Sequence, residues 1–447
     1  MESILFILLF ITVPFFLFTF LKLNNIDMFK PELFSITFWG YLFFAYIGIF
    51  PLYFGWDKYR VAAGITDKSI ILFILIYSAS AFVIISITYV VFMKVFKKFG
   101  QRINKFNSFK SWLPLNVYQS NFILLLLIFS TVVFMIYLFK IPEIPIFAQI
   151  KGYSTLEIKQ FRSLATNDFS GSYYLYKLFF DTVYTLVCLS LFANYLVKRT
   201  NSSLRIFLIS FFLSSFAAIY STQKAPFIWL LIALLLTYLI TLSRKISLKY
   251  IFRIGLAAII FLFFFYRTFM GLQDRGALEV FGSMLSRAIT GQISPAYYYL
   301  ELFPKVVNYL HGTSFPNPNG IFPFEHYRLT VEVMNMKFSN LSDLGIVGSA
   351  PTAFWGEAFA NFGYLGIIVS SFYIGILLTI VHLVFLHSKK SVFNIAVYVW
   401  MILEFNKLSS TGISNFIFNL NIISVLLIWL TFNYITFHRL KFKSKHT

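Results

Sequence analysis

Six basic residues lie apart from most other Lys and Arg residues of the chain, in segments that also carry tyrosines and carboxylates. They are Arg162, Lys224, Arg267, Arg275, Arg287 and Arg328. The guanidinium fork of arginine binds two phosphate oxygens at once, and a lysine adds a point charge. These residue types are therefore suited to holding a phosphate or diphosphate group.

Three of these cations also have simpler interpretations. Lys224 lies in STQKAP, a tight turn between two apolar runs, where a charge close to hydrocarbon is costly and usually serves a purpose. The alternative is a lysine whose ammonium reaches the lipid headgroups, and the same alternative applies to Arg267 at the end of an apolar run. Arg287 is the one cation on an expected interfacial helix, where a ligand phosphate and the membrane surface both remain open as its partner.

A carboxylate, an amide and a histidine are candidates for acid–base chemistry and sugar binding. Glu357 and Asn361 lie in GSAPTAFWGEAFANFGYLGI (348–367), four residues apart, which places them on one face of a helix. Glu357 is the first candidate for a general base and His311 the second. The alternatives are that Glu357 pairs with an arginine and that His311 is a solvated loop residue. Asn361 and Tyr298, the central member of three consecutive tyrosines, are the candidate sugar-binding residues.

Motifs of soluble enzymes are absent from the sequence. There is no phosphate-binding P-loop, no HExxH pair, no Cys/His metal spacing and no GxSxG elbow. The six histidines are scattered, so we expect neither a metal site nor a cofactor. The single cysteine, Cys188, lies in an expected membrane span, which excludes a disulfide framework.

The composition predicts an all-α polytopic membrane protein that forms a single transmembrane domain, 1–447. Hydrophobic residues make up 59% of the chain and charged residues only 12%, against about 25% charged in ordinary soluble domains. Continuous apolar runs of about twenty residues have the length of a membrane-spanning helix. The first run lacks a basic leader and a cleavage site, so we interpret it as a span and not as a signal peptide. The sequence predicts about eleven spans, near 3–21, 33–54, 70–93, 119–139, 173–196, 206–220, 226–242, 250–266, 364–386, 391–405 and 415–436.

The distribution of charge predicts the orientation. Six connecting segments hold 21 of the 37 Lys and Arg residues and only two acids, Asp27 and Glu32. They are 22–32, 94–118, 197–205, 243–253, 387–391 and 437–447. The positive-inside rule assigns these segments to the cytoplasm. Anionic lipid headgroups are the expected partner of this basic surface, and nucleic acid is excluded because no folded domain accompanies it.

Two connections on the opposite side are long. The first external loop is 140–172, and the second, 267–361, is much longer than an ordinary connection. In the second loop, Leu278, Phe281, Leu285 and Ile289 recur at helical spacing, which predicts an amphipathic helix lying on the membrane and ending near Pro295. The stretch HGTSFPNPNGIFPF (311–324) is rich in turn residues and predicts no regular element. The large loop is therefore expected to be partly helical.

The second loop and its exit carry a resemblance to a known family. HGTSF (311–315), the proline-rich stretch after it, Arg328 and GSAPTAFWGEAFANFGYLGI resemble the bacterial oligosaccharide repeat-unit polymerases of the Wzy-type O-antigen polymerase family. The turn STQKAP looks like that family's short basic turn, and Arg162 is similar to an arginine of its earlier external loop. Lys224 departs from the pattern, because many relatives have arginine there and lysine lacks the fork. The resemblance covers the layout from about the fourth span onward.

The resemblance implies a GT-C-like helical fold and a metal-independent glycosyltransferase in the bacterial inner membrane, with its active site facing outside. A growing glycan would pass from undecaprenyl diphosphate to the non-reducing end of a lipid-linked repeat unit, for O-antigen or capsule. Lipid-linked oligosaccharides would be donor and acceptor, and a chain-length regulator and a flippase would be partners. Combined with the charge argument, the family pattern selects five candidate diphosphate-binding residues, which are Arg287, Lys224, Arg328, Arg162 and Arg275.

Two alternatives remain open at this point. A flippase for lipid-linked glycans typically has two related halves and charges at the membrane midplane, and the sequence displays neither. An O-antigen ligase would share the donor chemistry and deliver the glycan to a different acceptor.

Overall fold

The computed structural model describes residues 2–96, 112–166, 169, 171–223, 225–246, 276–339 and 348–443, with isolated positions between 253 and 264. Every regular element in these ranges is a helix. An isolated bridge between Leu113 and Ser391 is the one extended pairing within them. The expectation of an all-α protein is confirmed for the part of the chain that the structure describes.

Eight of the described helical segments are long and apolar enough to cross a membrane, so the chain is a polytopic helical membrane protein. Single helices form five of them, which are α1 (Glu2–Leu23), α5 (Lys68–Val95), α7 (Val117–Lys140), α12 (Asn201–Ile219) and α19 (Phe354–His387). Joined helices form the other three, which are α2 (Leu33–Tyr41) with η1 (Leu42–Ile47) and α3 (Ile49–Tyr53), α10 (Tyr173–Lys177) with η3 (Leu178–Val183) and α11 (Tyr184–Lys198), and η7 (Ile413–Phe416) with α21 (Leu420–Lys443).

Three further spans were expected from the sequence. Two correspond to α13 (Ala225–Thr241) and α20 (Val392–Asn406), helices of 17 and 15 residues. These are shorter than the roughly twenty residues that a straight crossing requires. The third, 250–266, lies largely outside the described residues. The structure thus supports eight candidate spans of the expected eleven.

The chain folds into two compact units that are interleaved along the sequence. Unit 1 comprises Met1–Gln101, Ser247–Val384 and Glu404–Asn419, and unit 2 comprises Arg102–Ile246, Phe385–Leu403 and Leu420–Thr447.

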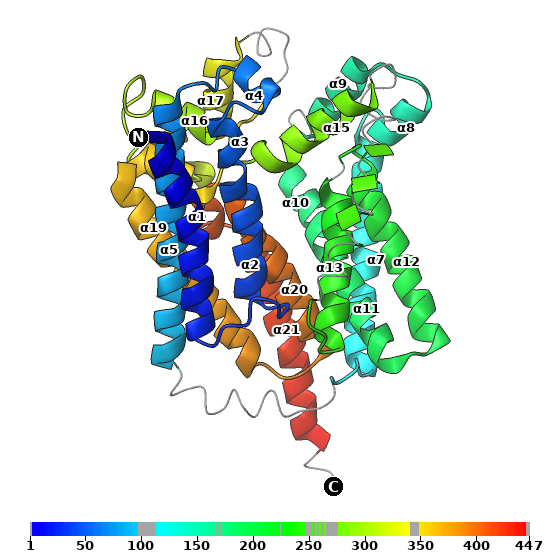
Figure 1. Cartoon of the computed structure of the whole chain (residues 1–447). Coiled ribbons are helices and arrows are strands. Elements are labelled where there is room, and N and C mark those ends of the chain that lie inside the picture. The colour runs from blue at the N-terminus through cyan, green and yellow to red at the C-terminus, as the bar shows by residue number, and fades with distance from the viewer. Residues whose placement is uncertain are drawn as a thin grey trace. The chain divides into compact units, whose positions relative to one another are not determined.

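In unit 1, α5 packs against α1, α3 and the short helix α16 (Ala296–Leu302). Gly375 of α19 lies so close to α5 that a Cβ atom would sit 2.6 Å from the Cβ of Thr88. The remaining elements of the unit are short. They are α4 (Lys58–Ala62), α15 (Ala277–Leu285), η4 (Ser286–Thr290), η5 (Pro318–Gly320), α17 (Leu329–Lys337) and η6 (Lys407–Ser409). In Figure 1, α4, α16 and α17 gather at the end of unit 1 where α1 begins.

In unit 2, α11 packs against α12 and α13, and α7 packs against α21. The Tyr137 and Tyr220 hydroxyls lie 3.1 Å apart, and the Tyr137 hydroxyl also donates to the carbonyl of Ala165. The latter bond attaches α9 (Thr155–Thr166) to α7. With α8 (Pro145–Ile150), α9 makes the first long connection, 140–172, partly helical.

The large connection 267–361 is also partly helical, as expected. It contains α15, η4, α16 and α17 within its described residues. The turn-rich stretch 311–324 holds a single three-residue 3-10 turn, η5. The exit of the loop differs from the expectation, because helix α19 begins at Phe354, ten residues before the predicted span at 364. Its first segment is set off by a kink at Phe362 and Gly363, where Gly363 has a φ of 60° that disfavours any residue with a side chain.

Candidate functional site

Glu357 is a buried carboxylate in the first segment of α19. Its side chain is 6% exposed, although α19 lies next to a polar loop. Oε1 accepts a hydrogen bond of 2.7 Å from the Ser314 hydroxyl, and Oε2 accepts one of 2.9 Å from the backbone N–H of Ser414. Burial of a carboxylate is costly unless hydrogen bonds satisfy its oxygens. Both oxygens are satisfied here by neutral donors, and no described basic side chain forms an ion pair with Glu357.

Asn361 lies one helical turn after Glu357 and is fully buried. Its Nδ2 donates to the Ser314 hydroxyl and to the carbonyl of Glu357, each at 2.8 Å. Its Oδ1 accepts from the backbone N–H of Gly312 at 2.7 Å. The prediction that Glu357 and Asn361 share one helix face is confirmed.

Together these bonds attach the HGTSF loop (311–315) to α19. Two main-chain bonds support them, from the N–H of Leu310 to the carbonyl of Ala360 and from the N–H of His311 to the carbonyl of Asn361. A third segment, around Gly412, closes over the carboxylate, because a Cβ at Gly412 would lie 2.1 Å from Oε2 of Glu357. The carboxylate is therefore enclosed by three segments of unit 1.

His326 is a second histidine beside this network, attached through its side chain, and the sequence pattern did not identify it. Its Nδ1 lies 3.0 Å from the carbonyl oxygen of Phe315, the residue after Ser314. Because a carbonyl can only accept, Nδ1 carries the proton and Nε2 is the acceptor in the neutral ring. The backbone N–H of Tyr327 donates to the carbonyl of Thr313 and fixes the same segment.

His311, the expected second candidate for the base, has a different environment. Its backbone takes part in the network, whereas its side chain is exposed and its φ of 49° is unusual for a residue with a side chain. The signal that could have identified His326 is its position between the turn-rich stretch and Arg328. That signal is weak, because nothing in the sequence reveals the contact with Phe315.

None of the described candidate cations forms an ion pair with Glu357. Arg287 on η4 and Arg328 at the start of α17 both lie in unit 1 and are exposed. Arg162 lies on α9 of unit 2. Its guanidinium is partly buried and has no described carboxylate partner, and this burial lowers its pKa. Lys224, Arg275 and Arg267 lie outside the described residues.

The expected amphipathic helix corresponds to α15 and η4. Val280 and Met284 are buried, whereas Leu278 is 87% exposed and Phe281 is also exposed. Of the four apolar positions that the sequence pattern assigned to one face, Leu278 and Phe281 are exposed and Leu285 and Ile289 are half-buried. This exposed apolar face is available to lipid.

Tyr298, the candidate sugar-binding tyrosine, is buried, and so are its neighbours Tyr297 and Tyr299. The Tyr298 hydroxyl donates to the carbonyl of Ala63, and the Tyr299 hydroxyl donates to the carbonyl of Ala350. The Tyr297 hydroxyl accepts from the N–H of Asp67. The three rings therefore pin α16 to the segments around it and do not form an open sugar platform.

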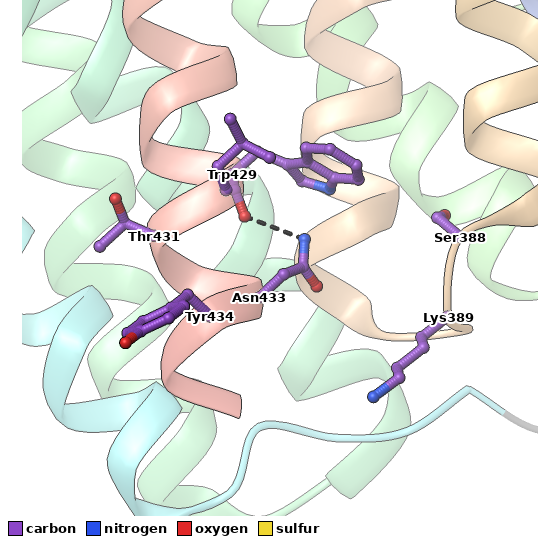
Figure 2. A pocket seen from close by; sticks show the side chains of 7 residues that line it. Ser388, Lys389, Trp429, Thr431, Asn433 and Tyr434 are labelled. Carbon is purple, nitrogen blue, oxygen red and sulfur yellow. Dashed lines mark hydrogen bonds between the residues drawn. The ribbon is translucent and has the colours of Figure 1, made fainter. Parts of the chain in front are cut away.

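A separate hollow of about 680 Å³ lies in unit 2, and Figure 2 shows the side chains that line it. Trp429 and Asn433 of α21 lie on the side of the helix toward Ser388 and Lys389 of the turn before α20, and Tyr434 lies on its other side. None of the candidate site residues lines this hollow, so it has no part in the chemistry proposed below.

The described residues contain no group of three or more His, Cys, Asp or Glu side chains placed to hold a metal ion. Comparison with protein-family models, with curated proteins and with solved structures finds no match to this chain.

Proposed function

We propose that the protein is a polysaccharide polymerase of the bacterial inner membrane, with its active site at the end of unit 1 where α1 begins. It would transfer a growing glycan from undecaprenyl diphosphate to the non-reducing end of a lipid-linked repeat unit. The observation that carries the proposal is the network of Glu357, Ser314 and Asn361. It holds a histidine-bearing polar loop against a membrane-spanning helix, in the unit that also carries Arg287 and Arg328.

In the proposed reaction, an acceptor hydroxyl oxygen bonds to the anomeric carbon of the donor glycan as the bond from that carbon to the diphosphate oxygen breaks. The acceptor's proton passes to a base, and undecaprenyl diphosphate leaves with the bonding electrons. Fixed positive charge stabilises the negative charge that develops on the diphosphate. Arg287 and Arg328 supply it from unit 1, and Arg162, Lys224 and Arg275 remain candidates in the other segments.

We assign the proton to His326. Both oxygens of Glu357 already accept hydrogen bonds, and the side chain is buried, so a substrate hydroxyl would have to displace Ser314 or the N–H of Ser414. The His326 ring is exposed, and its Nε2 is the acceptor position. Glu357 then acts as a positioning residue. Its bond to Ser314 fixes the loop at the residue before Phe315, and the carbonyl of Phe315 orients the His326 ring.

The orientation proposed here follows from the charge pattern. The segments rich in Lys and Arg would face the cytoplasm, which places the 267–361 connection outside. A site for a lipid-linked substrate at the outer interface suits this placement, because the glycan is then exposed while the prenyl chain stays in the bilayer.

The test is the surface glycan of a deletion strain. A strain that lacks a polymerase still makes, exports and attaches single repeat units and loses only the long chains. Loss of even the single-unit glycan would point to a flippase or a ligase instead. Unchanged chain length would remove the proposal.

A further inference from the structure

Helix α4 is joined to η4, the element that carries Arg287, across a long separation in sequence. The buried carboxylate of Asp57 caps α4 by accepting from the backbone N–H groups of Tyr59 at 3.1 Å and Arg60 at 3.3 Å. Its second oxygen accepts from the Thr290 hydroxyl on η4. In addition, the Tyr59 hydroxyl donates to the carbonyl of Glu279 on α15 at 3.3 Å. Arg60 therefore lies on an element bonded directly to the one that carries Arg287.

The guanidinium of Arg60 is half-buried and lacks a protein acceptor among the described residues. Its Nε is shielded from solvent and has no hydrogen-bond partner there. A buried donor on a charged group without a partner is costly, and such groups normally have an acceptor. An unpartnered guanidinium is therefore a position where an anionic ligand would be stabilised.

Three acidic side chains near α4 have other partners, and the exposed Glu279 on α15 forms no ion pair with Arg60 among the described residues. Asp57 bonds Thr290 and the backbone of α4, and Asp67 accepts from the N–H and hydroxyl of Ser69. Glu301 forms an ion pair with Lys337 at 2.6 Å. The positive charge of Arg60 affects the nearby Tyr298. Burial raises the pKa of the Tyr298 hydroxyl, and the charge of Arg60 opposes that rise.

We propose that Arg60 is a ligand-binding residue that, together with Arg287, holds the phosphate groups of a prenyl diphosphate. Two arginines on bonded elements can engage neighbouring phosphates, each with the bidentate geometry that guanidinium forks favour. The bonded segments also carry exposed apolar side chains that suit a prenyl chain. Trp56, next to Asp57, is 69% exposed, and Leu278, next to Glu279 on α15, is 87% exposed. The inference rests on the proposed function, since it names a residue for the diphosphate of the same lipid-linked substrate.

The experiment measures equilibrium binding of farnesyl diphosphate to the purified full-length chain in nanodiscs. Arg60→Ala is expected to weaken binding by about tenfold or more, the effect of losing a hydrogen-bonded charge. Arg60→Lys is expected to fall between wild type and Arg60→Ala, because it keeps the charge and loses the fork. Lys58→Ala is the matched control, since it removes an exposed positive charge from the same helix and is expected to bind as wild type does.

The thermal midpoint of each variant is measured alongside, and Arg60→Lys keeps the test valid where Arg60→Ala fails to fold. Equal affinities of the wild type, Arg60→Ala and Arg60→Lys would overturn the proposal, as would an equal loss in Lys58→Ala. Inorganic pyrophosphate is the second probe. Binding of pyrophosphate as tight as that of farnesyl diphosphate would overturn the prenyl-linked ligand. The two proposals can fail separately. If binding depends on Arg60 but the deletion strain keeps its glycan length, the diphosphate site is supported and the proposed polymerase function is refuted.

Discussion

Ser314 donates a hydrogen bond of 2.7 Å to Glu357, a residue 43 positions later in the chain. The same hydroxyl accepts from Asn361 at 2.8 Å, so its hydrogen is directed at the carboxylate. One serine thus joins the HGTSF loop to two residues of α19. Because Ser314, Glu357 and Asn361 are all buried, these bonds are shielded from competition by water.

This relationship predicts that Glu357 and Ser314 together hold the HGTSF loop against α19. Ser314→Ala leaves a buried carboxylate oxygen with one donor fewer, so we expect it to lower the free energy of unfolding by about 1 to 3 kcal/mol. Glu357→Gln also disturbs the network, because the amide has one acceptor oxygen where two are used. Glycan length should shorten in both variants in step with the thermal midpoint in detergent. Complete loss of polymer in Glu357→Gln at an unchanged midpoint would instead identify Glu357 as the base.

A second prediction separates the two histidines of the 267–361 connection. Because His326 is oriented by Phe315 and presents Nε2, we expect His326→Ala to slow polymerisation roughly a hundredfold or more, the usual effect of losing a general base. His311→Ala removes an exposed side chain and should leave the rate close to that of wild type. The measurement is the rate of chain extension on lipid-linked repeat units in membranes. A large loss of rate in His311→Ala with a near-normal rate in His326→Ala would instead identify His311 as the base.

Local patterns explain what could be predicted from the sequence. The apolar runs gave the helical spans, and the four-residue spacing placed Glu357 and Asn361 on one face, because both depend only on helix geometry. The kink that separates this segment from the rest of α19 depends on Gly363, whose conformation is imposed by its surroundings. A Cβ there would lie 3.0 Å from the Tyr309 hydroxyl oxygen, a contact between segments far apart in sequence.

The remainder of the site depends on contacts that leave no local signature. Asp57 and Thr290 are 233 residues apart, and nothing in the sequence relates Arg60 to Arg287. Tyr298 looks the same in sequence whether its ring stacks on a sugar or packs in a core, and its buried hydroxyl bond to Ala63 distinguishes the two. The spacing of Leu278, Phe281, Leu285 and Ile289 predicted an apolar helix face, but periodicity alone cannot say how much of that face the protein itself covers, and only Leu278 and Phe281 are exposed.

A third prediction concerns the start of α5. Asp67 caps this helix by accepting from the backbone N–H of Ser69 at 2.8 Å. The Ser69 hydroxyl also donates to the Asp67 carboxylate at 2.6 Å, and this bond together with the backbone bond lowers the pKa of the carboxyl below its ordinary value. A lowered folded-state pKa stabilises the fold above the unfolded value of about 3.9, and this contribution is lost as the pH falls through the folded value. Asp67→Ala should cost about 1 kcal/mol near neutral pH, and Asp67→Ser should retain most of the stability. Equal thermal midpoints for wild type and Asp67→Ala would contradict a capping role.

A fourth prediction tests the orientation with two single cysteines. Lys22 lies in the last turn of α1 and Lys305 in the large connection, and both side chains are exposed. The charge pattern predicts that an impermeant thiol reagent labels Lys305→Cys in intact cells and labels Lys22→Cys only after the membrane is opened. Cys188 is buried and should contribute little background. Labelling of position 22 but not 305 in intact cells would invert the orientation and place the site on the cytoplasmic side.

The last prediction concerns Arg287, whose exposed side chain could serve either a diphosphate or the membrane surface. Removing one donor from a preorganised charged site costs about 2 to 4 kcal/mol of transition-state stabilisation, which is roughly a hundredfold or more in rate. Arg287→Ala should therefore collapse glycan length at equal protein level, as should Arg328→Ala and Lys224→Ala if they belong to the same site. Lys305→Ala is the control, because it removes an exposed cation from the same connection.

Arg287→Lys then separates the two roles of Arg287. It should rescue poorly if the guanidinium fork binds two phosphate oxygens, and well if the charge alone is needed. An arginine that only reaches lipid headgroups would show a different pattern. In that case Arg287→Ala would keep full glycan length while the amount of protein in the membrane fell. Normal polymerisation in both Arg287→Ala and Lys224→Ala would remove the diphosphate site that the sequence pattern predicts.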